Sequence, residues 1–251
     1  MIAKRVQEVS TIDGQLIFKG GKAFLAPKAC REILSLGTRQ DVLWRTFQEI
    51  QKSSGTGKEP LVLDTDFFED ESKRRSENQN LKYHYLSGSG LSVISKQLGS
   101  RLTQEHRQDW AQAVAQYAPP VLESIEKHES EREQRIDKVM KQVKAQAKYY
   151  CQLTGCHRSV GKFNLTVHHL FHQKTYPKLA DMEMNLMAMR EDVHNHFYQW
   201  MGGTHVACTV EDLERYVEEF GNSLFPDGDV KQAIETRMQL SRAKNALRPL
   251  L

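Results

Sequence analysis

The stretch that decides the fold is CQLTGCHRSVGKFNLTVHHLFHQKTYPKLADMEMNLMAMREDVHNHFYQWMGG, residues 151–203. Within it, FNLTV alternates apolar and polar residues, as a half-buried strand does, and this run leads into the pair His168-His169. The segment REDVHNHFYQW has acidic residues at its start and is followed by Gly202-Gly203, which predicts a helix over 191–200. His194 on that helix can face the strand. The sequence therefore predicts a histidine site between a strand and a later helix.

Two adjacent histidines suit the hydrolysis of a phosphodiester bond. A side chain with a pKa of about 6.5 can take a proton from water and still be mostly neutral near pH 7. The reaction also needs a cation, because negative charge gathers on the phosphate and on the leaving oxygen. Neighbouring side chains of a strand point to opposite faces, so at the strand's end one ring can bind a metal while the other reaches the attacking water. We therefore expect a nuclease site at His168-His169.

The order of these residues resembles the signature of the HNH (His-Me finger) endonuclease family. That signature is a His or Asp followed by the base His at the end of the first strand of a hairpin, an Asn in the connecting segment and a His on the next helix. Here these are His168, His169, Asn185 and His194. The resemblance covers residues 149–220. It implies that His168 and His194 bind a divalent cation, that His169 is the general base, and that Asn185 braces the loop that orients His169.

The resemblance also implies a fold class. We expect an α+β protein, mostly helical, whose C-terminal half contains a ββα-metal motif. CQLTG and KFNLTVHH would supply the two strands of this motif, and residues 191–200 would supply its helix. The N-terminal region would be helical with a small α+β part.

The identity of the metal is left open by the residue at position 198. Many family members carry a further His one turn after the helical ligand, where this chain has Tyr198, and His196 falls on another face of the helix. Two protein ligands and several waters favour Mg²⁺ or Mn²⁺ over tightly held Zn²⁺. A separate structural zinc site is an alternative. Its ligands would be Cys151, Cys156, His205 and Cys208.

Basic residues near the motif predict DNA as the partner. A long helix expected over 121–149 carries lysines at spacings of three and four, and further cations lie within the motif. The predicted DNA contacts are Lys138, Lys141, Lys144, Lys148, Arg158, Lys162, Lys174 and Arg190. A lysine stripe is also typical of a solvated helix face, and that interpretation remains open.

The chain is expected to contain four segments. Residues 1–120 form an α+β and helical region with a role in target recognition, and a break at Pro119-Pro120 precedes the linking helix over 121–149. The nuclease domain follows over 150–220, and residues 221–251 form a C-terminal helix with a basic tail. In the first segment, residues 14–26 predict a hairpin around Gly20-Gly21, and residues 91–110 predict either a DNA-reading helix pair or a plain helical hairpin.

Composition limits the class of protein. The chain has 251 residues, of which 39% are hydrophobic and 27% charged, as in soluble globular proteins. A net charge of +3 does not by itself call for nucleic acid. No apolar run is long enough to span a membrane and no signal segment follows Met1, so we expect a cytoplasmic protein with no membrane partner. Four cysteines make no disulfide framework.

The function expected from these features is that of a metal-dependent endonuclease that hydrolyses DNA. One site of this kind cuts one strand at a time, so double-strand cleavage would need two visits, a homodimer or a larger complex. The alternative is a DNA-binding regulatory or scaffold protein with an inactive HNH site, and metal binding at His168 and His194 separates the two. A third interpretation is that the histidines are hydrogen-bonded core residues.

Overall fold

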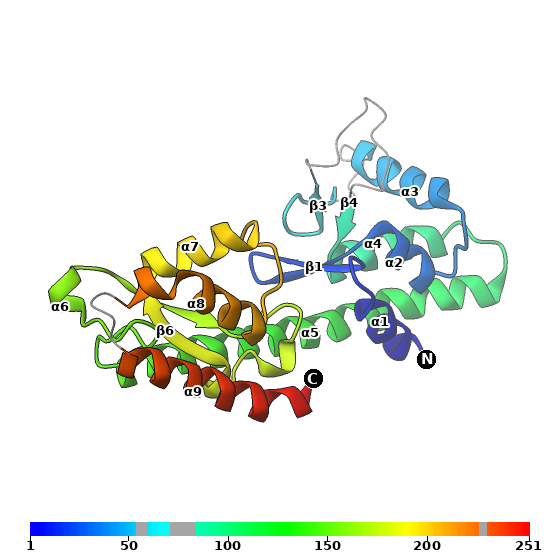
Figure 1. The fold of residues 1–251 in the computed structure, drawn as a ribbon. Helices are drawn as coiled ribbons and strands as arrows, with labels where there is room; N and C mark the ends of the chain where they lie inside the picture. Colours follow the sequence, from blue (N-terminus) through cyan, green and yellow to red (C-terminus); the bar gives the residue numbers. More distant parts are fainter. Residues whose placement is uncertain (54–59, 71–83, 226–229) are drawn as a thin grey trace. The chain divides into compact units, whose positions relative to one another are not determined.

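The computed structural model describes residues 1–53, 60–70, 84–225 and 230–251 (Figure 1). It shows an α+β fold that is mostly helical, as expected, with two small antiparallel sheets. The chain divides into two compact units, Met1–Ser130 and Glu131–Leu251. No helix in the described part of the chain is long and apolar enough to cross a membrane. Within the C-terminal segment expected over 221–251, residues 226–229 lie outside the described residues.

The first unit packs helices against an antiparallel sheet with the strand order β1-β2-β4-β3. The strands are β1 (Leu16–Lys19), β2 (Lys22–Leu25), β3 (Phe67–Glu69) and β4 (His84–Leu86). The helices are α1 (Ile2–Ser10), α2 (Pro27–Ile33), α3 (Gln40–Lys52), α4 (Gly88–Gly99) and the first part of α5 (Glu105–Gln146). The predicted hairpin is confirmed as β1 and β2, and Gly20 and Gly21 both have the positive φ (57° and 78°) that its two-residue turn needs.

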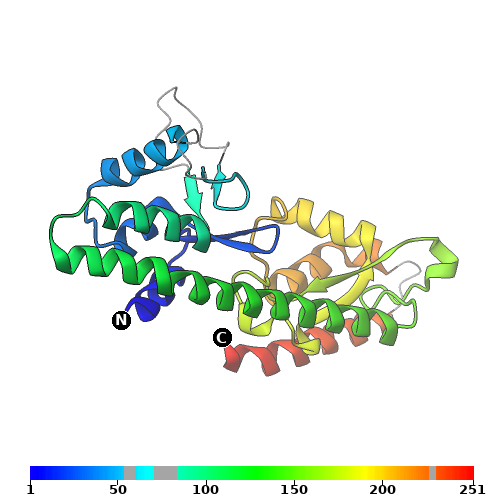
Figure 2. The same ribbon diagram turned by 180° about the vertical axis from the view of Figure 1, so that it is seen from behind.

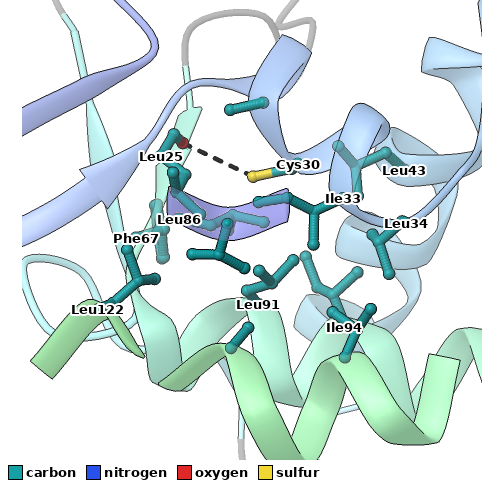
Figure 3. Packing of buried hydrophobic residues seen from close by; sticks show 14 of the residues in the cluster. Leu25, Cys30, Ile33, Leu34, Leu43, Phe67, Leu86, Leu91, Ile94 and Leu122 are labelled. Carbon is teal, nitrogen blue, oxygen red and sulfur yellow. Dashed lines mark hydrogen bonds between the residues drawn. The ribbon is translucent and has the colours of Figure 1, made fainter. Parts of the chain in front are cut away.

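The core of the first unit joins the sheet to its helices (Figure 3). Leu25 and Leu86 from the sheet are fully buried with Ile33 of α2 and Leu91 of α4. Cys30 Sγ lies 3.7 Å from the carbonyl oxygen of Leu25, and burial raises the pKa of the Cys30 thiol to about 12. Cys30 is therefore a protonated packing residue.

The predicted break at Pro119-Pro120 is wrong. Both prolines lie inside α5, which continues through them. A proline inside a helix removes one backbone hydrogen bond and crowds the preceding turn, so the sequence favoured a break. Packing overrides that preference: Ala118 and Leu122 are buried, and Pro119 lies so close to Gly88 of α4 that a Cβ there would be 3.0 Å from its Cα. The helices expected over 91–110 are α4 and the start of α5, and their role in reading DNA remains a prediction.

The second unit is built around the hairpin of β5 (Leu165–His169) and β6 (Leu186–Arg190). The later part of α5 enters this unit. The other helices are α6 (Arg158–Gly161), α7 (Glu191–Met201), α8 (Val210–Leu224) and α9 (Val230–Leu247), and the short 3-10 turns are η3 (Pro177–Leu179), η4 (Glu183–Asn185) and η6 (Arg248–Leu250). The predicted helix over 191–200 is confirmed as α7, which ends at Gly202 with φ 91°.

The hairpin is covered on both faces. Met187 and Met189 of β6 belong to the core that includes Val193 and Phe197 of α7. On the other face, Val167 of β5 belongs with Leu186 and Ala188 of β6 to a cluster that also contains Val143 of α5 and Ala147, which directly follows α5. Figure 2 shows α5 crossing this second face of the hairpin. A hairpin covered on both faces must bury whatever polar side chains its strand ends carry.

The predicted strand at CQLTG is wrong. Residues 151–155 form turns, where Gly155 has φ 70° and its N–H donates to the carbonyl of Cys151 at 2.8 Å. The second strand of the hairpin is instead β6. Its first four residues, LMAM, are all apolar and all buried, so they show no alternation that would indicate a strand. The strand expected over KFNLTVHH is confirmed for Leu165–His169.

The close approach of α4 to Asp66 gives a prediction about stability. A Cβ at Gly90 would lie 1.9 Å from the carbonyl oxygen of Asp66, whereas a Cβ at Gly99 on the same helix would lie 3.5 Å from its nearest neighbour. We expect Gly90→Ala to lower the free energy of unfolding by about 3 kcal/mol, because the backbone must shift. Gly99→Ala should raise it by up to about 1 kcal/mol, because alanine favours a helix. Urea unfolding followed by circular dichroism measures both, and equal effects would contradict the close approach.

Candidate functional site

The structure brings His168 and His194 of the predicted nuclease site together, with His169 next to His168 in the chain. His168 and His169 are the last two residues of β5, and their register partners are Met187 and Leu186. His194 lies in the first half of α7, and its ring centroid is 5.4 Å from that of His168. Asn185 does not touch these rings. It immediately precedes β6 and acts on the loop between the strands.

His168 has a buried ring nitrogen with nothing in the protein to bind. The residue is 1% exposed, and its ring lies edge-on to those of Phe197 and Tyr198. Burial, together with the nearby His194, lowers the pKa of His168 to about 3, so the ring is neutral. Its Nδ1 has no hydrogen-bond partner among the described residues. A neutral imidazole with a free nitrogen beside a second histidine fits a metal ion.

His169 is held by one backbone carbonyl. Its Nε2 lies 3.0 Å from the carbonyl oxygen of Ala180. A carbonyl only accepts, so Nε2 carries the hydrogen and Nδ1 carries the lone pair. Burial lowers the pKa of His169 and the bond to Ala180 partly opposes this, so the ring is neutral near pH 7. Nδ1 is therefore the nitrogen that can take a proton.

Asn185 closes the loop that carries Ala180. Its Oδ1 accepts from the N–H of Phe171 at 2.7 Å, and its Nδ2 donates to the carbonyls of Phe171 (3.1 Å) and Leu179 (3.0 Å). The residue is 0% exposed, so water cannot replace these bonds. Ala180 follows Leu179 directly. Asn185 thus joins the two sides of the loop, and the next residue after Leu179 carries the carbonyl that is bonded to His169.

Helix α7 places His194 and Tyr198 beside His168. His194 is half-buried, and burial lowers its pKa, although Asn195 and Glu191 oppose this. Tyr198, one turn later, has its ring centroid 4.8 Å from that of His194. Burial and the neighbouring Cys208 raise the pKa of Tyr198, so it presents a hydroxyl group rather than a phenolate. His196 points elsewhere, because its Nδ1 lies 2.7 Å from Tyr216 Oη.

Cys208, a ligand in the alternative zinc site expected from the sequence, lies instead beside His168 and His169. Its Sγ lies 3.4 Å from the carbonyl oxygen of His169 and 3.9 Å from Nε2 of His168. Burial raises the pKa of Cys208 to about 11, so the thiol is protonated. The thiol can donate to the carbonyl of His169 and accept from Nε2–H of His168. That arrangement leaves Nδ1 as the free nitrogen of His168. Cys208 stands just before the Thr209–Asp212 capping box of α8, and no spacing links it to β5.

The alternative zinc site is not formed. No group of three or more His, Cys, Asp or Glu side chains in the described ranges could hold a metal ion. Cys151 Sγ instead lies 3.4 Å from the backbone N–H groups of Thr154 and Arg190. Cys156 Sγ lies 3.8 Å from the carbonyl oxygen of Thr154. These thiols therefore belong to the turn at 151–156.

Seven of the eight predicted DNA contacts are exposed cations. They are Lys138, Lys141, Lys144, Lys148, Arg158, Lys162 and Lys174. Arg190 differs, because its guanidinium hydrogen-bonds to Asp192 and lies 5.0 Å from the ring of Phe163. Residues 138–180, which the structure describes throughout, contain eight Lys or Arg and no Asp or Glu. None of the seven exposed cations forms an ion pair with a described residue. This surface suits an anionic partner.

Comparisons of the chain with protein-family models, with curated proteins and with solved structures find no match.

The bonds of Asn185 give a prediction about stability. Asn185→Ala would leave the N–H and the carbonyl of Phe171 unpaired, and the Leu179 carbonyl would keep only its bond from the Met182 N–H. Each buried unpaired group costs about 1–3 kcal/mol. We expect the free energy of unfolding to fall by about 3 kcal/mol. Asn164→Ala is the control, since Asn164 is exposed and makes one side-chain bond, to Glu191 at 3.1 Å. Asn164→Ala should lower the free energy of unfolding by about 0.5 kcal/mol. Chemical denaturation compares the two, and equal losses would show that Asn185 does not hold the loop.

Proposed function

We propose that this chain is a metal-dependent endonuclease of the HNH type that hydrolyses DNA phosphodiester bonds. In this proposal β5, β6 and α7 are the ββα-metal motif. The observation that carries it is the unpartnered Nδ1 of a buried, neutral His168 whose ring lies 5.4 Å from that of His194. A buried polar atom without a partner is unfavourable unless something binds there.

The metal would be held by His168 and His194, with water and phosphate oxygens completing its coordination. A bound divalent cation would stabilise the negative charge that develops on the phosphate and the leaving oxygen. Mg²⁺ or Mn²⁺ fits a site with few protein ligands, and imidazole nitrogens also accept Zn²⁺. The hydroxyl of Tyr198 stands where many HNH enzymes have a further His, and it can hydrogen-bond to water in the site.

His169 would be the general base. Its Nδ1 would take a proton from the water that attacks phosphorus, while Nε2–H stays bonded to the carbonyl of Ala180. That bond strengthens as the ring becomes positive, because a charged donor binds a carbonyl more strongly. Asn185 would keep the carbonyl in place through Leu179. The proton acceptor is thus oriented by backbone that cannot rotate away.

DNA binding is supported by the acid-free segment. Lys138, Lys141, Lys144 and Lys148 are exposed, while Val143 and Ala147 of the same stretch pack on the hairpin. The lysines therefore follow the solvent side of the structure that holds the site. Cations spaced in this way bind phosphates, and the affinity falls as salt concentration rises.

Cleavage assays test the base assignment. With supercoiled plasmid and Mg²⁺ or Mn²⁺, His169→Ala should cut about 10²–10⁴-fold more slowly than the wild type, because the proton acceptor is lost. His205→Ala is the matched control, since His205 is exposed, and it should cut at the wild-type rate. Gel analysis of nicked and linear products measures both rates and shows whether one or two strands are cut.

Near wild-type cleavage by His169→Ala would remove His169 from the reaction. DNA binding should be unchanged in both variants, and binding by electrophoretic shift in EDTA checks this. Cleavage that persists in EDTA would contradict the metal requirement.

Metal titration tests the ligands without relying on activity. Calorimetric titration with Mn²⁺ or Zn²⁺ should show one site, which His194→Ala abolishes. Cys208→Ala should weaken binding about 10–100-fold, because partners that orient a ligand are worth about that much. Cys208→Ser should restore most of it, since a hydroxyl can also donate and accept. Unchanged binding in Cys208→Ala would show that Cys208 does not orient His168.

A second candidate function is that of a DNA-binding regulatory or scaffold protein with an inactive site. The observation that favours it is Tyr198, whose raised pKa keeps a protonated phenol where many HNH enzymes have a nitrogen ligand. DNA binding with neither metal binding nor cleavage would establish this alternative.

A further inference from the structure

The chain leaves α5 through an unusual turn. Lys148 and Tyr149 both have positive φ (47° and 66°), a conformation that residues other than glycine seldom adopt. The carbonyl of Tyr149 accepts from the N–H of Arg158 at 2.9 Å, and Tyr150 forms an antiparallel bridge with His157. These contacts hold the turn against the start of α6. The turn fixes two consecutive tyrosines in one place.

Both tyrosines are exposed but supported from one side. Tyr149 is 60% exposed and Tyr150 is 50% exposed. Their ring centroids lie 6.5 Å and 4.7 Å from that of His157, in edge-on contact. His157 is itself fixed, because its Nδ1 lies 2.6 Å from Ser159 Oγ and accepts from the Ser159 N–H. Large aromatic surface is therefore held rigidly in solvent. We call these three residues the tyrosine platform.

Exposed cations flank the residues of the tyrosine platform in the sequence. Lys144, Lys148, Arg158 and Lys162 are exposed and lie within the segment that has no Asp or Glu. Rigid aromatic rings among cations are the combination by which proteins bind single-stranded nucleic acid, where the bases stack on the rings and the cations contact the phosphates. Bases inside a duplex are already stacked on each other and cannot reach such rings.

We propose that the tyrosine platform stacks an unpaired base, and that the preferred partner of this chain is DNA with a single-stranded segment. This deepens the proposed function and rests on it for the choice of DNA. Cys151, next to Tyr150, contacts the backbone of Arg190, which pairs with Leu165 at the start of β5. His169 is four residues further along β5, or about 13 Å at the usual rise of a strand. The base would thus be held away from the reacting phosphate, as a substrate-selecting contact.

Binding measurements in EDTA test this inference separately from cleavage. Fluorescence anisotropy compares a labelled single strand with the duplex of the same sequence, using the full chain. Tyr149→Ala should weaken single-strand binding about 5–100-fold and change duplex binding less than about twofold, because stacking contributes only to the former. Tyr149→Phe should bind like the wild type, since the ring is kept. Tyr117→Ala, which removes a 51% exposed tyrosine from the first unit, is the matched control.

A fluorescent base shows stacking directly. The fluorescence of 2-aminopurine in the single strand should be quenched by the wild type and by Tyr149→Phe, and not by Tyr149→Ala. Absence of single-strand binding by the wild type, or equal losses on both DNAs, would overturn the inference. If Tyr149→Ala lost binding to anionic phospholipid vesicles and kept single-strand binding, the tyrosine platform would be assigned to a membrane instead. If single-strand binding behaves as expected but no cleavage is found, the endonuclease proposal fails and this inference stands.

Discussion

The hydrogen bonds of one buried amide hold the candidate site together. Asn185 binds the backbone on both sides of the loop between β5 and β6, at Phe171 and at Leu179. Without those bonds the carbonyl of Ala180 would have no fixed position, and His169 would lose the partner that decides which of its nitrogens carries the hydrogen. An amide suits this position because it donates and accepts at once, which no carboxylate can do when it is ionised. The geometry of the loop therefore determines which nitrogen of His169 carries the hydrogen.

Burial lowers the pKa of both adjacent histidines but leaves their rings with different partners. His168 faces α7 and is enclosed by aromatic rings, whereas His169 points to the loop and keeps a backbone partner. Both rings are neutral because burial disfavours their charged forms. His168 keeps a buried Nδ1 with no hydrogen-bond partner among the described residues, and Cys208 lies beside its other nitrogen. The end of β5 thus presents one ring that can bind a metal and another that can accept a proton.

Much of this arrangement could be predicted from local patterns, and the failures have physical causes. The alternation before His168 predicted β5, and the acidic start and final glycines predicted α7, because those signals act over a few residues. β6 was missed because burial on both faces removes alternation. The continuity of α5 through Pro119-Pro120 depends on packing against Gly88, and the role of Cys208 depends on a contact across 40 residues. Neither the continuity of α5 nor the contact of Cys208 can be predicted from the residues next to it in the sequence.

The net charge of the whole chain conceals an uneven distribution of charged residues along the sequence. Residues 138–180 hold eight of the chain's 35 Lys and Arg and none of its 32 Asp and Glu, so this segment has a formal charge of +8 and the remainder −5. The net +3 therefore describes neither part. The segregation reaches the neighbourhood of the site, because burial and then the positive charge of Lys174, which lies in this segment, lower the pKa of His172. It also means that the described part of the chain brings no cluster of carboxylates to the histidines. In the proposed function, the negative charge that a bound cation needs would come from the phosphate of the DNA. The basic segment that binds the DNA would then also bring in the phosphate that completes the coordination of the metal.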